Sequence, residues 1–288
     1  KKHKAAGKSR EAALVLPGNR IIYSEQEKKN MDLGLRDKVA VITGGSRGIG
    51  RGMALGLAAE GCRIATCARG EEALKNSAEE IAARGVEVLA MPLDITEPDA
   101  PQRFVEAVVQ RFGRLDILVN NVGGNRRKLF TETTDDDWDA ILDLNVKVHV
   151  RISRAVVPHM KAAGGGAILF VSSVFGREAG GPGLAIYNTT KSALISVAKI
   201  MSLELAADGI RVNSIAPGSI RFPGGSWDRR VQADPEGMQA FIEQHLPVGR
   251  FGTVEEVANV ATFLVSERAS LVTGACLNVD GGQSKSLI

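Results

Sequence analysis

The segment Thr43-Gly44-Gly45-Ser46-Arg47-Gly48-Ile49-Gly50 decides the fold, because it joins a short apolar run to a helix-forming run. Residues 39–43 are rich in β-branched side chains and predict a buried strand, whereas residues 49–60 have helical periodicity. Glycines at such a turn let the backbone bend sharply and approach a bound group. The free N–H groups of the following helix favour a phosphate, so the segment predicts a pyrophosphate site.

Apolar runs and helix-forming runs alternate along the rest of the chain. Further strands are predicted at residues 63–67, 86–92, 117–120, 167–172, 211–216 and 276–279, and helices at residues 71–84, 98–112, 135–163, 185–207 and 254–266. A strand that lies parallel to its predecessor needs a crossover connection. This order therefore predicts a single-domain, doubly wound α/β fold, a Rossmann-type parallel sheet of about seven strands with helices on both faces. Ligands of such sheets bind at the carboxyl ends of the strands.

The composition is that of a water-soluble domain. The chain has 288 residues, of which 44% are hydrophobic and 24% are charged. No apolar run approaches the roughly 18 residues that span a bilayer, and the apolar patch at residues 12–16 is too short for a signal peptide. We therefore expect a cytoplasmic protein without a membrane partner. The three cysteines lack metal-ligand spacing, which predicts buried thiols and no metal site.

The positive charge is concentrated at the N-terminus. Residues 1–30 hold eight Lys or Arg and three Glu, a net charge of +5 against +3 for the whole chain, so the remainder carries −2. A basic tail on a slightly acidic body argues against a nucleic-acid partner. Regular alternation begins only at Lys38, and Met31 is placed like a start residue. We interpret residues 1–30 as a basic N-terminal extension, whether flexible, a leader or a cloning remnant, and residues 31–288 as the catalytic domain.

Tyr187 and Lys191 form the pattern Y-x-x-x-K at the start of a predicted helix, so both side chains lie on one helix face. Hydride transfer to a carbonyl requires a proton donor, and the reverse reaction requires a base. A tyrosine serves both roles when a neighbouring positive charge lowers its pKa. This spacing is also common for an exposed pair, so the pattern alone does not decide the function.

Several motifs together resemble the short-chain dehydrogenase/reductase family, in its branch of about 250 residues. Thr43, Gly44, Gly48 and Gly50 match its motif T-G-x-x-x-G-x-G. Asp94 stands where the family contacts adenine, the sequence at 120–123 is similar to N-N-A-G, and residues 278–282 resemble the closing strand. The resemblance extends from about residue 36 to residue 283, with the motifs in the family's order.

The resemblance implies a catalytic set of four residues. Tyr187 would be the acid/base, and Lys191 would bind the cofactor and lower the pKa of the tyrosine. Ser173 would polarise the substrate carbonyl; Ser172 fits the pattern as well, but alignment on Gly176 favours Ser173. Asn145 matches the family's helix-kinking asparagine, which holds a water next to the lysine and extends a proton relay.

The expected cofactor is NADP(H) rather than NAD(H). An acidic residue at the end of the second strand would bind an adenosine ribose, whereas this chain has Ala68-Arg69 there and a second cation in Arg47. A guanidinium suits a 2′-phosphate, although both arginines can also be read as solvated surface cations. Phe222 replaces a threonine of the family, which puts one cofactor hydrogen bond in doubt. The full expected cofactor set comprises Gly44, Ser46, Arg47, Gly48, Ile49, Gly50, Arg69, Asp94, Ile95, Asn121, Gly123, Tyr187, Lys191, Pro217, Gly218 and Ile220.

The substrate stays open at the level of sequence. Loops at 123–130, 174–186 and 221–246 are expected to line the cleft, the last as a mobile lid. Arginines at 126, 127, 177 and 221 raise the possibility of an anionic substrate. A 3-oxoacyl-thioester reductase, a sugar or polyol dehydrogenase and a cyclic-ketone reductase are alternatives. The helix ends at 161–164 and 206–209 lack a basic patch for an acidic carrier protein.

Two further expectations concern activity and assembly. The alternative to an enzyme is a dinucleotide-binding sensor without catalytic activity. The presence of all four catalytic residues argues against this alternative. The family resemblance also implies a homotetramer or homodimer joined through the two long helices.

Overall fold

The computed structural model describes residues 31–287, and within them the centre is a seven-stranded sheet in the order β3-β2-β1-β4-β5-β6-β7. Each neighbouring pair of strands is parallel. The strands are β1 (Val39–Thr43), β2 (Arg63–Ala68), β3 (Val88–Pro92), β4 (Ile117–Asn120), β5 (Gly166–Val171), β6 (Ile210–Pro217) and β7 (Cys276–Val279). The predicted doubly wound α/β fold is confirmed.

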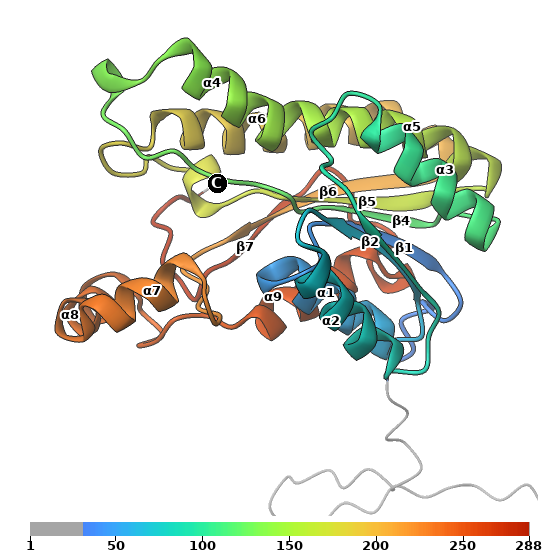
Figure 1. Ribbon diagram of the computed structural model, residues 1–288, viewed down its shortest axis with the longest axis horizontal. Helices are drawn as coiled ribbons and strands as arrows, with labels where there is room; N and C mark the ends of the chain where they lie inside the picture. The colour runs from blue at the N-terminus through green and yellow to red at the C-terminus, as the bar shows by residue number, and fades with distance from the viewer. Residues whose placement is uncertain (1–30, 288) are drawn as a thin grey trace, which may run out of the picture. The chain divides into compact units, whose positions relative to one another are not determined.

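Helices cover both faces of the sheet, as Figure 1 shows. On one face lie α1 (Gly48–Ala59), α2 (Glu71–Ala82) and α9 (Val254–Val265); on the other lie α3 (Ala100–Phe112), α4 (Asp135–Leu142), α5 (Val148–Ala162) and α6 (Ala185–Glu204). Each face has its own apolar core. Leu57 of α1 and Ala261 of α9 belong to one, and Phe104 of α3 and Val156 of α5 to the other. Residues from Leu33 onward form one compact unit.

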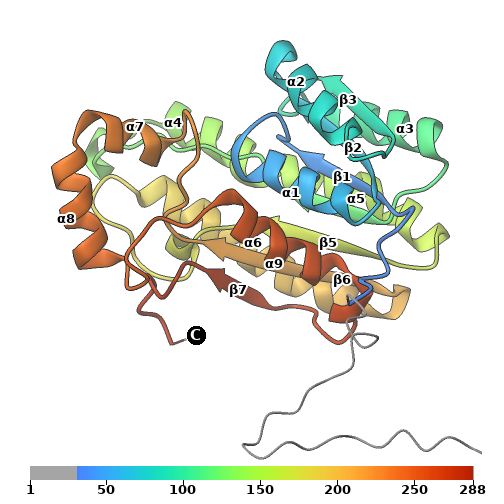
Figure 2. The same cartoon turned by 90° about the horizontal axis from the view of Figure 1, so that it is seen from below.

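The strand order reverses next to β1, which pairs with β2 on one side and β4 on the other. Figure 2 shows β1 beside β2, with α1 and α2 next to them. At such a switch point the loops leaving the two carboxyl ends separate and form a ligand crevice. The segment 43–50, hereafter the glycine loop, leaves β1 at this point. Residues 120–124, hereafter the 120–124 loop, leave β4 beside it.

The long helix predicted at 135–163 is interrupted. After α4, residues Asp143–Lys147 form a π-helical turn before α5 begins. The wider turn is centred on Asn145, whose buried side chain bonds to groups outside the helix. A π-turn of this kind is typical of functional sites, where it displaces a side chain from the regular helical position. The strand predicted to begin at residue 86 begins at Val88.

The segment 221–246 was expected to be a loop, and that expectation was wrong. It contains α7 (Ser226–Ala233) and α8 (Pro235–His245), seen together at one end of the sheet in Figure 1. Trp227 stacks 4.8 Å from Phe241 and 5.2 Å from Phe251, measured between ring centres. This aromatic cluster gives the two short helices an apolar core of their own.

Other features agree with the sequence. Cys62 and Cys67 are buried free thiols, and burial raises the pKa of both to about 12, so they are unreactive. Among the helices of residues 31–287, none has the length and apolar character that a membrane crossing requires. The proposed extension at residues 1–30 lies outside the described residues.

Candidate active site

The glycine loop forms a tight cradle between β1 and α1. Gly48 adopts φ +56°, a left-handed conformation that glycine adopts without strain. A β-carbon at Gly50 would collide with the carbonyl oxygen of Gly44, so the loop can close only with glycine there. Among the described residues no side chain caps the first turn of α1. The backbone N–H groups of that turn are therefore available to an anion, and the loop fits the pyrophosphate of a dinucleotide.

The 120–124 loop is tied to the glycine loop. The Thr43 hydroxyl accepts the N–H groups of Asn121 (3.0 Å) and Val122 (3.2 Å). The Asn121 amide donates to the carbonyl oxygens of Thr43 (2.9 Å) and Gly44 (3.2 Å). These four bonds fix the floor of the crevice across the two strand ends, where the structure places the predicted residues Gly44 and Asn121.

Tyr187 and Lys191 lie one turn apart on α6 and face the carboxyl end of β5. The Lys191 Nζ donates to the Val171 carbonyl oxygen (2.9 Å) and lies 5.7 Å from the centre of the Tyr187 ring. Burial lowers the pKa of Lys191 from 10.5 to about 8, because removal from water disfavours the charged ammonium. The pair is therefore part of an enclosed site, not the exposed pair that the spacing alone also allowed.

The two candidate serines have different partners. The Ser172 hydroxyl donates to the Lys191 carbonyl oxygen (2.8 Å), which holds α6 against β5. The Ser173 hydroxyl hydrogen-bonds the Tyr187 phenol, which lowers the pKa of the phenol, while the stronger effect of burial raises it. This geometry favours Ser173 over Ser172 as the residue beside the reacting oxygen. The phenol is held in its protonated form, the form that donates a proton.

Asn145 closes the site from the π-turn. Its Oδ1 accepts the Gly124 N–H (2.8 Å), and its Nδ2 donates to the Gly124 carbonyl (2.9 Å) and to the Thr190 hydroxyl (3.0 Å). The Thr190 hydroxyl donates to the Tyr187 carbonyl (2.9 Å). A β-carbon at Gly123 would lie 3.3 Å from the Lys191 Nζ and 3.4 Å from the Asn145 Oδ1. All four predicted catalytic residues thus converge on one end of the sheet.

The adenosine end of the crevice carries the two expected arginines. Arg47 is exposed on the glycine loop, and the Arg69 side chain is 77% exposed at the end of β2. Asp94 follows β3 and lies 3.9 Å from the Arg69 guanidinium. A hydrogen bond from the Thr96 hydroxyl lowers the pKa of Asp94, so this carboxylate stays charged. Ile95 beside it is buried and lies in the same turn.

The loop after β6 forms the other end of the crevice. Ser219 donates its N–H to Gln283 (2.8 Å), and Ile220 forms a bridge with Gly252. This arrangement holds the predicted segment 217–220 at the carboxyl edge of the sheet. Phe222 packs on the glycine loop, with its Cζ 2.6 Å from the position of a β-carbon at Gly48. An aromatic ring therefore stands where the family has a threonine hydroxyl.

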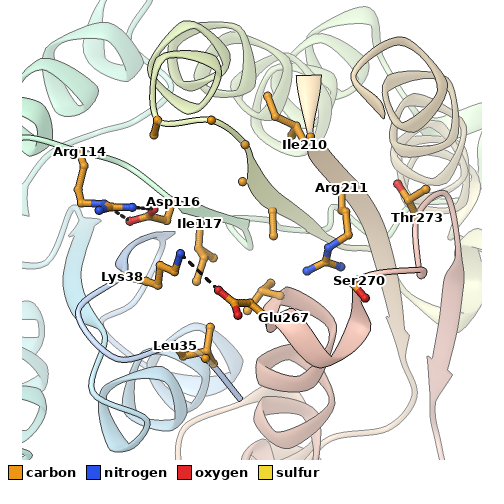
Figure 3. A pocket seen from close by; sticks show the side chains of 18 of the residues that line it. Leu35, Lys38, Arg114, Asp116, Ile117, Ile210, Arg211, Glu267, Ser270 and Thr273 are labelled. Atoms are coloured by element: carbon orange, nitrogen blue, oxygen red, sulfur yellow. Dashed lines mark hydrogen bonds and ion pairs between the residues drawn. The ribbon is translucent and has the colours of Figure 1, made fainter. Parts of the chain in front are cut away.

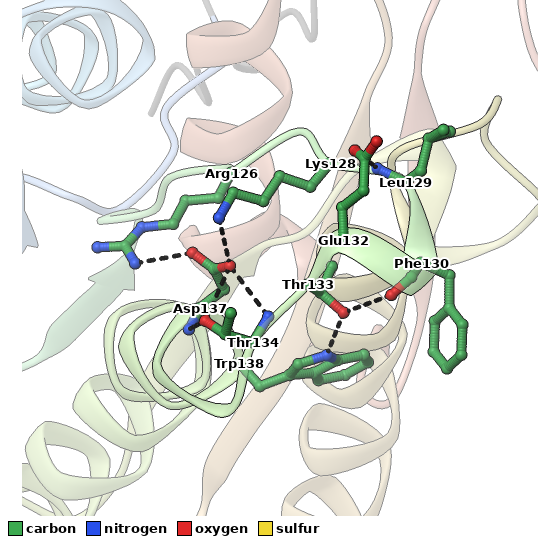
Figure 4. Close-up of polar contacts among 9 residues, drawn as sticks. All are labelled: Arg126, Lys128, Leu129, Phe130, Glu132, Thr133, Thr134, Asp137 and Trp138. Carbon is green, nitrogen blue, oxygen red and sulfur yellow. Dashed lines mark hydrogen bonds and ion pairs between the residues drawn. The ribbon is translucent and has the colours of Figure 1, made fainter.

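Asp137 holds the cleft loop at 123–130, as Figure 4 shows. Its nearly buried carboxylate accepts from Arg126 (3.1 Å), from Lys128 (2.7 Å) and from the Thr134 N–H and hydroxyl (both 3.1 Å). The Lys128 ammonium is the main cause that keeps the pKa of Asp137 far below its usual range. Asp137 is also the third residue of α4, in a capping box with Thr134.

The other arginines of the cleft loops are also engaged by protein groups. Their partners are the Pro182 carbonyl for Arg127, the Cys276 carbonyl for Arg177 and the Asp228 carboxylate for Arg221. Each of the four arginines that had suggested an anionic substrate is therefore bound to another group of the protein and has a structural role. This pairing disfavours their use as a binding site for a charged substrate.

A cavity of about 720 Å³ lies at the opposite, amino-terminal edge of the sheet (Figure 3). Lys38 pairs with Glu267 (3.6 Å) and Arg114 with Asp116 (2.6 Å), and the Arg211 guanidinium donates to backbone carbonyls. The helix ends at 163–164 and 206–209 line this cavity. They are thus remote from the active site, and their charge does not bear on docking of a carrier protein, contrary to the expectation from the sequence.

Three polar residues around the active site were not predicted from the sequence. His149 and Ser153 follow Asn145 at intervals of four on the same helix face, and both are buried. Thr190 links Asn145 to Tyr187. The available signal was the recurrence of a polar residue every four positions, next to the apolar residues Val148, Ile152 and Val156 of the buried helix face.

The fold and the site together define a dinucleotide-dependent oxidoreductase. A glycine cradle at the switch point of the sheet lies beside a tyrosine, a lysine and a serine that can exchange a proton with a substrate oxygen. Comparison with known proteins gives the particular family. A family model described as enoyl-(acyl carrier protein) reductase matches residues 44–284.

Similar proteins carry several different names. The chain is 38% identical over 248 residues to the 3-oxoacyl-[acyl-carrier-protein] reductase FabG of Thermotoga maritima, covering 86% of this chain and 98% of that protein. A structure of L-sorbose reductase from Gluconobacter frateurii with NADPH and L-sorbose is 38% identical, with a TM-score of 0.85 and coverage of 89% of this chain and 100% of the other. A 7α-hydroxysteroid dehydrogenase with NADH and 7-oxo glycochenodeoxycholic acid is 32% identical, with a TM-score of 0.81 and coverage of 89% and 98%.

The chain belongs to the short-chain dehydrogenase/reductase family. It is an oxidoreductase that interconverts a CH–OH group and a carbonyl with NAD(P). The names of the relatives refer to different kinds of carbonyl compound. Membership of the family therefore indicates the class of reaction and a small-molecule substrate, but not which compound is the substrate.

Proposed function

We propose that this enzyme is an NADP(H)-dependent reductase in which Tyr187 is the general acid/base for a small carbonyl or secondary-alcohol substrate. The observation that carries the proposal is the convergence of Ser173, Tyr187 and Lys191 at the carboxyl end of β5, beside the glycine cradle. Convergence of proton-exchanging groups next to a dinucleotide cradle is what hydride transfer to a carbonyl requires.

The contacts support a catalytic role for each of these residues. When bound, the reduced nicotinamide supplies the hydride that the carbonyl carbon accepts. Tyr187 donates its phenolic proton to the carbonyl oxygen as the C=O bond becomes a C–OH bond, and it removes that proton in the reverse reaction. The Ser173 hydroxyl, which bonds the phenol, also polarises the carbonyl. Lys191 stabilises the tyrosinate that remains, because a cation near the phenol favours its ionised form.

Asn145 acts on the proton path. It lies behind Gly123 and Lys191, and through Thr190 it reaches the first turn of the catalytic helix. We propose that a water held between Asn145 and Lys191 returns a proton to Tyr187 after each turnover. The polar, enclosed surroundings of the Lys191 ammonium support such a relay.

The cofactor is NADP(H), for which the adenosine end of the crevice is suited. Arg47 and Arg69 project from the loops after β1 and β2, where a 2′-phosphate would lie, and Asp94 with Ile95 borders the adenine position. The glycine loop would hold the pyrophosphate through the backbone at Ser46, Gly48, Ile49 and Gly50. The segment at Pro217, Gly218 and Ile220 would contact the nicotinamide. The L-sorbose reductase structure, which contains NADPH, supports this choice.

Two substrate classes stay as alternatives within the family. A polyhydroxylated ketone is supported by the L-sorbose reductase structure, and a 3-oxoacyl thioester by the FabG relatives. A panel of L-sorbose, other ketoses, acetoacetyl thioesters and cyclic ketones, followed by NADPH absorbance, separates these classes. The silent sensor is tested in the same assay, because it would bind NADPH and turn over no member of the panel.

The remaining expectations concern organisation. We propose that residues 31–288 are the catalytic domain and that copies associate as a dimer or tetramer through α5 and α6. The exposed apolar side chains of Ile200 and Leu203 on α6 support this surface. Light scattering tests the assembly. A cytoplasmic location stays a prediction from the sequence.

A further inference from the structure

His149 is a buried histidine of α5 that the catalytic scheme does not use. Its Nε2 lies 2.9 Å from the Val122 carbonyl oxygen, and its Nδ1 lies 3.2 Å from the side-chain Oδ1 of Asn120. The ring packs edge-on against Phe170 of β5, with 6.2 Å between the ring centres. The ring is therefore held on three sides, and it touches the 120–124 loop at two residues.

The partners determine where the proton of His149 lies. Both ring nitrogens face an oxygen atom, and a neutral ring has one proton to donate. The contact to Val122 is the shorter one, and a backbone carbonyl can only accept, so we assign the proton to Nε2. Complete burial and the nearby Lys191 charge keep the ring neutral, as its pKa of about 3 reflects. Nδ1 is then an acceptor. In the structure the Asn120 amide turns its Oδ1 toward Nδ1 and donates from Nδ2 to the Ser153 hydroxyl (3.1 Å). Exchange of the amide O and N positions, which leaves the outline of the side chain unchanged, lets the amide nitrogen donate to Nδ1 and the Ser153 hydroxyl donate to the amide oxygen.

We infer that His149 is a positioning residue for the cofactor, which fixes the Val122–Gly123 peptide of the 120–124 loop through its Nε2 proton. In a trans peptide the C=O and the N–H point in opposite directions. With the Val122 carbonyl held toward α5, the Gly123 N–H must point away from that helix. The inference rests on the proposed function, because its effect is exerted on NADP(H) binding.

The position of Gly123 makes this orientation matter. Gly123 lies against the Lys191 Nζ, the group proposed to bind the cofactor beside Tyr187. Helix α5 and its π-turn hold the loop at two points, with Asn145 on Gly124 and His149 on Val122. Thr43 holds the opposite side of the loop. Loss of the His149 bond would leave the Val122 peptide free to rotate between these anchors.

The test compares two substitutions of His149. Glutamine can present an amide N–H to Val122 from a position similar to Nε2, whereas leucine has a similar size and no donor. Val156→Ala is the matched control, because Val156 is fully buried in the same apolar core and lies two helical turns beyond His149 on α5. NADPH affinity is measured by titration calorimetry, and unfolding temperature is measured in parallel.

The expected result is a Kd for NADPH that rises about tenfold in His149→Leu, stays within about threefold of the wild type in His149→Gln, and is unchanged in Val156→Ala despite its lower unfolding temperature. Equal affinity of the wild type and His149→Leu would overturn the inference, as would an equal loss in all three variants. A wild type that binds no NADPH would instead refute the proposed function.

An independent readout does not depend on the cofactor. The chain has four histidines, so the imidazole ¹⁵N spectrum of selectively labelled protein can be assigned by the signal lost in His149→Gln. His149 is expected as the neutral Nε2–H tautomer, with no titration between pH 5 and pH 9. The Nδ1–H tautomer, or titration in that range, would contradict the bond to Val122.

Discussion

The Lys191 ammonium lies 5.7 Å from the centre of the Tyr187 ring and is held there by a hydrogen bond to the Val171 carbonyl. This places a buried cation beside a phenol at the carboxyl end of β5. The phenol is protonated in the free enzyme because burial raises its pKa. The lysine becomes useful once negative charge develops on the phenolic oxygen, since the low-dielectric surroundings strengthen their attraction.

Lys191 should make stability depend on alkaline pH. Its pKa is about 8 in the folded protein, against 10.5 for a lysine side chain in water. Below pH 8 the folded state bears the full cost of the buried ammonium, and this cost is relieved as pH rises toward 10.5. The free energy of unfolding of the wild type, relative to Lys191→Met, should therefore increase by about 3 kcal/mol across that range. Urea denaturation at pH 7 to 10 measures the difference, and a flat difference would contradict it.

His149 should contribute to acid sensitivity. Its pKa is about 3 in the folded protein, against 6.5 for a histidine side chain in water, chiefly because burial disfavours the imidazolium. The stability that depends on a neutral ring is complete above pH 6.5 and is lost progressively toward pH 3. His149→Gln, which cannot take up this proton, should unfold at lower pH than the wild type when acid titration is followed by circular dichroism. Coincident acid transitions would show that other groups dominate.

Arg69 should determine the choice between NADPH and NADH. Arg69→Asp replaces the cation proposed for the 2′-phosphate with a carboxylate that repels it and can bind the ribose instead. The KM for NADPH should rise at least about tenfold, as expected for loss of a charge-assisted contact, while the KM for NADH falls. Arg84→Asp, which places the same charge change after α2, is the control. Parallel changes in both coenzymes would show that Arg69 has no role in the choice.

Asp137 should stabilise the cleft loop. Asp137→Asn removes the charge that holds Arg126 and Lys128 and weakens the start of α4. We expect a lower unfolding temperature and a higher KM for the substrate, with the Kd for NADPH unchanged. Asp136→Asn, at an exposed position in the same turn, should have little effect. A Kd for NADPH that changes with Asp137→Asn would mean that the loop also holds the cofactor.

The sequence predicted the fold well because hydrophobic periodicity reports burial directly. All seven strands and the glycine loop lie where the periodicity placed them, with shifts of one or two residues at the ends. Helices α7 and α8 were not predicted because Gly224, Gly225 and Pro235 are residue types that usually mark loops. In the structure, Pro235 instead begins α8, with the Asp234 side chain as its N-cap.

Site residues that belong to a sequence motif could be predicted. Site residues whose role depends on contacts between distant parts of the chain could not. Tyr187, Lys191, Ser173 and Asn145 follow from the family resemblance and converge in space. His149 belongs to no motif, and the sequence of an amphipathic helix does not show which carbonyl group a buried histidine will contact. The sequence analysis assigned the C-terminal ends of α5 and α6 to the wrong edge of the sheet, because these helices run antiparallel to the strands. Their carboxyl ends therefore lie at the edge opposite the active site.

The most direct test of the account is the comparison of Tyr187→Phe with the wild type, measuring kcat on the best substrate of the panel together with the Kd for NADPH. Removal of the phenolic hydroxyl leaves the ring in place and takes away only the proposed acid/base. The account predicts that kcat falls by about 10²–10⁴-fold while the Kd for NADPH changes less than about threefold. A variant that keeps wild-type kcat would contradict the assignment of Tyr187.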